Sequence, residues 1–202
     1  MISTVAADRK NAYPSLIAAL CERDAYTRHH CDRVSSLAVK MGRELKLSVS
    51  ALESLRIASQ LHDVGKIGVR DDVLFKPGRL LPDEWEQMKA HSIHGERIIK
   101  ETFLLNKSDV ASIVRHHHEA FDGSGYPDGL SGKEIPQSCR ILLVIDAYDA
   151  ITTSRPYQKS RSHVEAMDIL ESEVGTKLDP DMFSLFSQTI ANGSTRESNI
   201  RN

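Results

Sequence analysis

The sequence has 202 residues, of which 26 are basic and 28 are acidic, so its formal net charge is −2. This length fits one domain and is ample to bury a hydrophobic core. The near-neutral charge argues against binding to a DNA or RNA polymer, because proteins that do so usually show a strong basic excess.

The three cysteines, Cys21, Cys31 and Cys139, are widely separated and form no CxxC pair that would indicate a zinc site or a redox dithiol. The charged N-terminus lacks the apolar segment of a signal peptide. The longest apolar run, residues 141–145, is too short to cross a bilayer. These features predict a cytoplasmic protein with reduced thiols and no membrane association.

Helical periodicity dominates the chain, and Ser48 is expected to cap the helix that runs to His62. The apolar run 141–145 has an alternative interpretation as a buried strand, which we reject because no second such run exists to pair with it. We predict an all-α domain over residues 14–192, preceded by an arm (1–13) and followed by a polar tail (193–202). Its expected helices cover 15–22, 27–45, 48–62, a segment from about 82, segments through 117 and 153, 162–173 and 180–190.

His62 continues the apolar face of its own helix, since it lies four residues after Ala58 and seven after Leu55. A histidine in this position should point into the interior. We expect Gly65 to end the helix by adopting a positive φ. Asp63 points about 100° further round the helix, so His62 and Asp63 can coordinate the same ion only at a helix end. That geometry suits a carboxylate that bridges two ions.

A buried histidine paired with a neighbouring aspartate for structural reasons is the commoner arrangement for such a dipeptide alone. The pattern recurs, however, with His91, His117 and Asp146 on the apolar faces of three further helices. Several helices that each direct one ligand-type side chain inward are hard to explain as coincidence. Mixed imidazole and carboxylate ligands favour Fe, Mn, Co, Ni or Zn.

Two ions bridged by a carboxylate can hold a hydroxide for attack on phosphorus. An anionic substrate would then need basic side chains nearby, and Lys66, Arg155 and Lys159 are the candidates. The alternative for each is a solvated surface charge, which we favour for Lys159. Residues 122–129 form a glycine-rich turn directly after the histidines, where a loop can either shape a substrate pocket or simply connect two helices.

The sequence resembles the HD-GYP family, the branch of the HD metal-dependent phosphohydrolases that degrades cyclic di-GMP. The resemblance covers residues 14–190 and rests on motifs that occur in the same order. They are Asp24-Ala25-Tyr26-Thr27 with His30, His62-Asp63-Val64-Gly65-Lys66-Ile67-Gly68, Lys76-Pro77-Gly78, His91 with Gly95, His117-His118-Glu119, Asp122-Gly123-Ser124-Gly125-Tyr126-Pro127, Asp146-Ala147-Tyr148-Asp149-Ala150 and Arg155-Pro156-Tyr157.

The resemblance implies a bundle of about seven helices that holds two or three divalent transition-metal ions, iron or manganese. Asp63 would be the bridging carboxylate, and Lys66, Tyr126 and Arg155 would contact substrate. His116 precedes the matched pair and is left out. The residues that match the metal ligands of the family are His30, His62, Asp63, His91, His117, His118 and Asp146.

Two positions depart from the family pattern. Members with three metals carry a glutamate where this chain has Tyr26, so we expect a two-metal centre and the linear product pGpG. Gln158 stands where a basic residue often follows the Arg-Pro-Tyr motif, which would weaken one phosphate contact.

The expected activity is hydrolysis of cyclic di-GMP, in which a metal-bridging hydroxide attacks phosphorus while Lys66 neutralises developing charge. Two alternatives stay open: a metal-containing module that binds cyclic dinucleotides with little turnover, and a phosphohydrolase for another nucleotide such as cyclic GMP-AMP. Exposed terminal helices could support a homodimer, and the loop around Tyr126 could contact a regulatory protein or a diguanylate cyclase.

Overall fold

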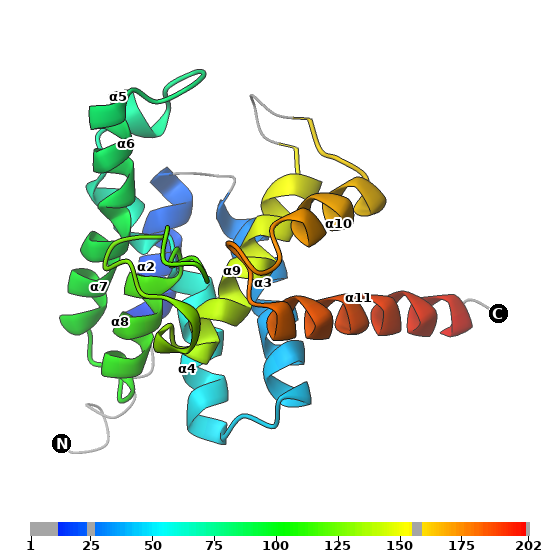
Figure 1. Ribbon diagram of the computed structural model, residues 1–202. Coiled ribbons are helices and arrows are strands. Elements are labelled where there is room, and N and C mark those ends of the chain that lie inside the picture. The colour runs from blue at the N-terminus through cyan, green and yellow to red at the C-terminus, as the bar shows by residue number, and fades with distance from the viewer. Residues whose placement is uncertain (1–11, 24–26, 155–158, 201–202) are drawn as a thin grey trace, which may run out of the picture.

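The computed structural model describes residues 12–23, 27–154 and 159–200, which fold into helices without a β-strand (Figure 1). The all-α prediction is confirmed, and the run 141–145 lies inside a helix. The elements in chain order are α2 (Ala12–Arg23), α3 (Thr27–Glu44), α4 (Val49–Leu61), the 3-10 helix η1 (Val64–Gly68), α5 (Asp71–Leu74), α6 (Pro82–Lys89), α7 (His91–Lys100), α8 (Lys107–His116), the 3-10 helix η2 (Gly132–Glu134), α9 (Gln137–Thr152), α10 (His163–Ser172) and α11 (Pro180–Ile200).

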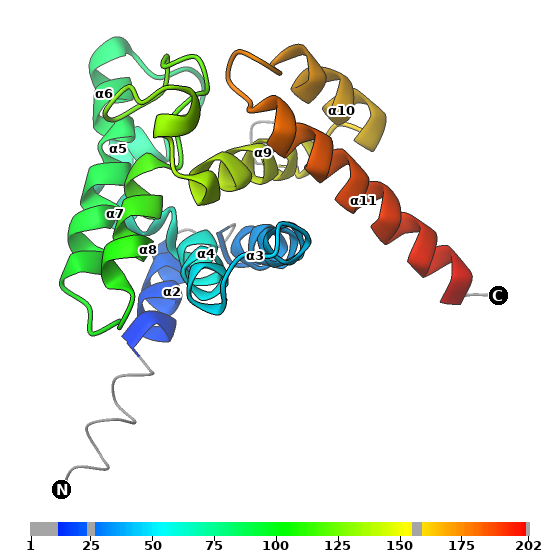
Figure 2. The same ribbon diagram turned by 60° about the horizontal axis from the view of Figure 1, so that its bottom comes forward.

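The core lies where α4 packs between α3 and α8, and where α9 packs against α3. Fully buried side chains from these helices include Met41, Leu55, Val114, Leu142 and Ile145. Burying side chains of this size contributes about 1.5–3 kcal/mol each, so this cluster holds the four helices in fixed positions. Figure 2 shows α11 leaving the body of the protein along its C-terminal part. No helix in the described ranges has the length and apolarity needed to cross a bilayer.

Local sequence explains the start of α4 as predicted. The Ser48 hydroxyl accepts a hydrogen bond from the Ala51 backbone N–H at 3.2 Å and so caps the helix. The helix ends at Leu61, which leaves His62 at its C-cap and Asp63 outside it with φ −91° and ψ 3°. His62 and Asp63 are therefore adjacent at a helix end, where both side chains can face the same interior region.

The expectation that Gly65 adopts a positive φ is wrong. Gly65 lies in η1, and the described glycines with positive φ are others, among them Gly78. A Cβ on Gly65 would instead stand 1.8 Å from the carbonyl oxygen of His91. The glycine is required because the backbone of η1 touches the start of α7, which brings Asp63 and His91 together.

The connection between α4 and α6 is more ordered than the sequence indicated, since it contains η1 and α5. The helix expected from Pro82 is divided at Ala90 into α6 and α7, and α11 continues past the predicted end at residue 190. The described ranges therefore hold more helical segments than the seven or so expected.

Arg23, at the end of α2, fastens that helix to η1. Its guanidinium donates to the carbonyl oxygen of Lys66 at 3.3 Å, to that of Val69, and to the Asp71 carboxylate at 2.7 Å. One side chain thus ties the first described helix to the segment that follows His62 and Asp63.

Candidate metal centre

Two groups of ligand-type side chains meet in the interior. The His30 cluster consists of His30, His62 and Asp146, and the His91 cluster consists of His91, His117 and His118. Within each cluster one possible ligand atom per residue lies within 4.8 Å of the others. Six of the seven predicted ligands are thereby brought together, and they come from α3, α7 and α9 and from the residues that directly follow α4 and α8.

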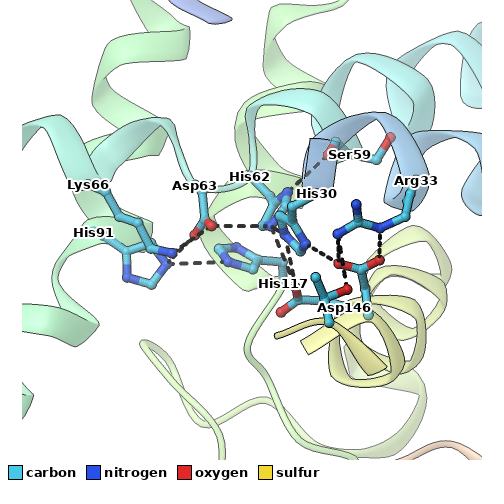
Figure 3. Close-up of polar contacts among 11 residues, drawn as sticks. His30, Arg33, Ser59, His62, Asp63, Lys66, His91, His117 and Asp146 are labelled. Carbon is cyan, nitrogen blue, oxygen red and sulfur yellow. Dashed lines mark hydrogen bonds and ion pairs between the residues drawn. The ribbon is translucent and has the colours of Figure 1, made fainter. Parts of the chain in front are cut away.

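Asp63, the seventh predicted ligand, lies between the two clusters (Figure 3). Its Oδ2 is 3.6 Å from Nε2 of His62, and its Oδ1 is 3.7 Å from Nε2 of His91. Each carboxylate oxygen thus faces a different cluster. This is the geometry that a bridging carboxylate requires.

The histidine rings are oriented by hydrogen bonds at Nδ1. This atom donates to the carbonyl oxygen of Ser59 in His62, of Met88 in His91 and of Val114 in His117, at 3.0, 2.7 and 2.7 Å. Because a carbonyl oxygen can only accept, the proton of each neutral ring must sit on Nδ1. The Nε2 lone pair of each ring therefore points into a cluster, which is the usual arrangement of metal-binding histidines.

The Nε2 atoms of His91 and His117 lie only 3.4 Å apart. Both rings are buried, and burial lowers the pKa of His91 and lowers that of His117 well below its usual range, so both are neutral. Two lone pairs then face each other with no proton between them. A cation in this position would turn a repulsive contact into two favourable ones, so the donor set fits a metal ion.

His30 is oriented by a carboxylate instead of a carbonyl oxygen. Its Nδ1 lies 2.8 Å from Oδ2 of Asp149, and Asp149 accepts two hydrogen bonds from Arg33 at 2.6 and 2.9 Å. Our sequence analysis gave neither Asp149 nor Arg33 a role in the site. Asp149 lies one helical turn after Asp146, and that spacing was the available signal.

We predict that Asp149→Asn weakens metal binding at the His30 cluster about 10- to 100-fold, the usual cost of losing a carboxylate that orients a ligand histidine. The His91 cluster should bind as before, since Asp149 orients no ring in it. Calorimetric titration with Mn²⁺ measures both affinities. Asp168→Asn, an exposed change on α10, is the matched control. If Asp149→Asn weakened metal binding equally at both clusters, the role of Asp149 in orienting His30 would be contradicted.

The two clusters should differ in their response to pH. Burial lowers the pKa of His30, but the Asp146 and Asp149 carboxylates outweigh it and raise this pKa to about 9. Burial lowers the pKa of His118 to about 3, and neighbouring His91 adds to the effect. In the metal-free protein at neutral pH, the His30 cluster therefore holds a proton that a metal must displace, whereas the His91 cluster does not.

We accordingly predict that metal affinity at the His30 cluster falls about tenfold per pH unit as the pH is lowered below 9. Affinity at the His91 cluster should stay nearly constant between pH 6.5 and 9. Calorimetry in buffers of different ionisation enthalpy would count the released proton. Identical pH slopes at the two clusters would refute this expectation.

Lys66 lies at the edge of the centre and donates to Oδ2 of Asp63 at 2.6 Å. Burial raises the pKa of Asp63, but Lys66 and the surrounding histidines outweigh it and hold this pKa well below its usual range. The Asp63 carboxylate is therefore ionised throughout the neutral range. Lys159 is exposed, in agreement with the surface interpretation, while Tyr26, Arg155 and Gln158 lie outside the described residues.

Tyr126 covers the His91 cluster from the loop that follows α8. Its ring centroid is 4.8 Å from that of His118 and 6.4 Å from that of His91. The buried carboxylate of Glu119 holds this loop by accepting from the backbone N–H groups of Asp128 and Leu130 at 2.7 and 3.0 Å. Tyr126 is thus fixed over the site.

His116 does not take part in the centre. Its Nδ1 donates to the carbonyl oxygen of Ser112 at 2.9 Å, and its Nε2 lies 2.8 Å from Oδ2 of Asp128. The choice of His117 and His118 over His116 therefore agrees with the geometry, although the assignment of the seven ligands stays a prediction.

Comparison with known proteins identifies the family. The model of the family described as "HD domain" matches residues 14–182. A cyclic di-GMP phosphodiesterase of Thermotoga maritima is 39% identical over 164 residues, which cover 81% of this chain and 45% of the relative. The cyclic di-GMP phosphodiesterase response regulator RpfG of Xanthomonas campestris is 38% identical over 165 residues, covering 82% of this chain and 44% of the relative. The chain therefore spans less than half of these two relatives.

A third relative, the 3′3′-cGAMP-specific phosphodiesterase 3 of Vibrio cholerae, is 34% identical, with 83% of this chain and 36% of the relative covered. Among solved structures, the Bdellovibrio bacteriovorus protein Bd1817 has a TM-score of 0.64 at 20% identity, over 82% of this chain and 52% of that one. The HD domain of PgpH from L. monocytogenes, in complex with cyclic-di-AMP, has a TM-score of 0.62 at 15% identity, over 89% and 96%. These two structures share the fold, and the chain belongs to the HD domain family, in its HD-GYP branch.

Proposed function

We propose that this chain is a phosphodiesterase that uses two divalent metal ions to open cyclic di-GMP to the linear dinucleotide pGpG. The observation that carries the proposal is the pair of Nε2 atoms of His91 and His117, which face each other at 3.4 Å. The Nδ1 proton of each ring is donated to a backbone carbonyl oxygen, so no proton lies between the two Nε2 atoms. An interior that opposes lone pairs in this way is built for a cation.

The ions would be held by the His30 and His91 clusters, with Asp63 shared between them. Once bound, they would supply an activated water and neutralise charge on a phosphodiester, which are the established roles of paired ions in hydrolases. The protein's own part is to fix the ligands and to keep Asp63 ionised. Lys66 places a cation beside Asp63, where negative charge would develop on the phosphate oxygens during attack.

The relatives favour cyclic di-GMP as the substrate. Two named for cyclic di-GMP reach 39% and 38% identity, against 34%, 34% and 32% for three named for 3′3′-cGAMP. Cyclic GMP-AMP stays the second candidate because relatives named for it align over a similar share of the chain. Tyr126 and Arg155 are proposed to contact the substrate, together with Lys66.

Two clusters joined by one bridging carboxylate account for two ions, and Tyr26 replaces the glutamate associated with a third. We therefore propose pGpG, not GMP, as the main product. Iron or manganese fits the mixed imidazole and carboxylate ligands.

The test is hydrolysis by protein that has been purified anaerobically and loaded with Fe²⁺ or Mn²⁺. Cyclic di-GMP and 3′3′-cGAMP are supplied separately, products are followed by chromatography, and metals per chain are counted by mass spectrometry. Appearance of pGpG with about two metals would support the proposal. GMP as the main early product would refute the two-metal assignment, and faster cleavage of cGAMP would favour the second candidate. Full metal loading without turnover would indicate a binding module.

A further inference from the structure

We infer that Trp85 is a substrate-binding residue of this centre, whose indole stacks on a purine base of the bound dinucleotide. The inference rests on the proposed function, because it extends the same site outward from the metal ligands. Trp85 lies on α6, six residues before His91, and our sequence analysis gave it no role.

Trp85 belongs to a row of rings that leads from the metal centre to solvent. Its ring centroid lies 6.1 Å from that of Tyr126 with the two planes at 80°, and Tyr126 in turn lies 4.8 Å from His118. Whereas His91 is 2% exposed, Trp85 is 46% exposed. The row therefore begins at a ligand histidine and ends in an indole that a ligand can reach. In Figure 1, α6, the helix that carries Trp85, extends beyond α7 at the edge of the bundle.

The Trp85 side chain leaves part of its aromatic surface open to solvent beside Tyr126, which covers the His91 cluster. Part of the Trp85 ring packs edge to face against Tyr126. The remainder is open next to a site for a nucleotide, in which each base is joined through one sugar to its phosphate. With the scissile phosphate at the metal clusters, a neighbouring base would reach the rim. Aromatic side chains bind bases of any sequence in this way.

One cationic side chain beside Tyr126 could meet a phosphate of the ligand, although Glu84 and Glu86 flank Trp85 on the same helix. Nζ of Lys89, one turn after Trp85 on α6, lies 5.9 Å from the centroid of Tyr126. Lys89 pairs with Glu86 at 2.7 Å, and the Glu86 side chain is 70% exposed. The Glu86 end of this pair is open to solvent while the Lys89 side chain is 25% exposed, so an incoming phosphate could replace Glu86 as the partner of the Lys89 ammonium group.

Trp85 is the single tryptophan of the chain, so its fluorescence reports directly on this position. We expect cyclic di-GMP to quench the emission of the metal-loaded protein in a stopped-flow experiment with enzyme in excess, and the emission to recover as product leaves. Trp85→Ala should raise KM about 5- to 100-fold, the loss expected for one base-stacking contact, with a smaller effect on kcat. Trp85→Phe, which keeps an aromatic face, should restore most of the affinity.

Phe103→Ala is the matched control, because Phe103 is an exposed aromatic residue (72%) beyond the opposite end of α7. Thermal unfolding of each variant separates loss of binding from loss of structure. Turnover without quenching, or an unchanged KM in folded Trp85→Ala protein, would overturn the inference and leave the proposed function intact. Quenching without turnover would support the role of Trp85 while refuting the proposed phosphodiesterase activity.

Discussion

Asp63→Ala should abolish activity and reduce the metal content of the purified protein below two ions per chain. The two carboxylate oxygens of Asp63 face different clusters, one at 3.6 Å from Nε2 of His62 and the other at 3.7 Å from Nε2 of His91. Its removal also leaves the Lys66 ammonium group without the carboxylate that accepts its hydrogen bond. Lewis-acid stabilisation is worth several kcal/mol, so we expect the rate to fall at least about 10³-fold.

The measurement combines metal counting by mass spectrometry with chromatographic detection of pGpG. Asp72→Asn is the matched control, since Asp72 is an exposed aspartate paired with Arg70. This variant should keep two metals and full activity. If Asp63→Ala retained both metals and turnover, Asp63 would not bridge the clusters and the proposed centre would be wrong.

Lys66→Met should lower kcat about 10²- to 10³-fold while both metals stay bound, the usual cost of removing one group that stabilises charge in the transition state. Lys66 donates to Oδ2 of Asp63 but belongs to neither cluster, so its loss should spare the ligand geometry. Methionine keeps the length of the side chain and removes its charge. Steady-state kinetics and metal counting on the same preparation make the comparison.

Lys100→Met provides the control, because the Lys100 side chain is 58% exposed and pairs with Glu96 within α7. It should leave kcat unchanged. A rise in KM alone in Lys66→Met would show that Lys66 binds the substrate without stabilising the transition state. Loss of metal would show that the lysine supports Asp63 structurally.

Sequence periodicity predicted that His62, His91 and His117 meet in the interior, whereas His30 and His118 were added by the family resemblance. His62, His91 and His117 each continue an apolar helix face, and such a face must turn toward the core. Since all three faces border one core, their polar members had to converge. Ser48 and the helical state of residues 141–145 followed from equally local signals.

Features that depend on contacts distant in sequence could not be predicted in this way. The hydrogen bond between His30 and Asp149 joins residues 119 positions apart, so the spacing of Asp149 after Asp146 could place it on the same helix face but could not identify His30 as its partner. The role of Gly65 likewise depends on where the carbonyl oxygen of His91 lies. An expected positive φ was the local explanation for this glycine, whereas the actual cause is the close approach of another segment.

The Arg23 guanidinium links the position of α2 to that of the segment that carries Lys66. It grips the backbone carbonyl of Lys66, and the amine of that same lysine holds the carboxylate shared by the two clusters. A movement of the end of α2 would therefore shift Lys66, and through it the hydrogen bond to the Asp63 carboxylate. α2 is thus connected to the two clusters by hydrogen bonds, although it contributes no residue to either of them.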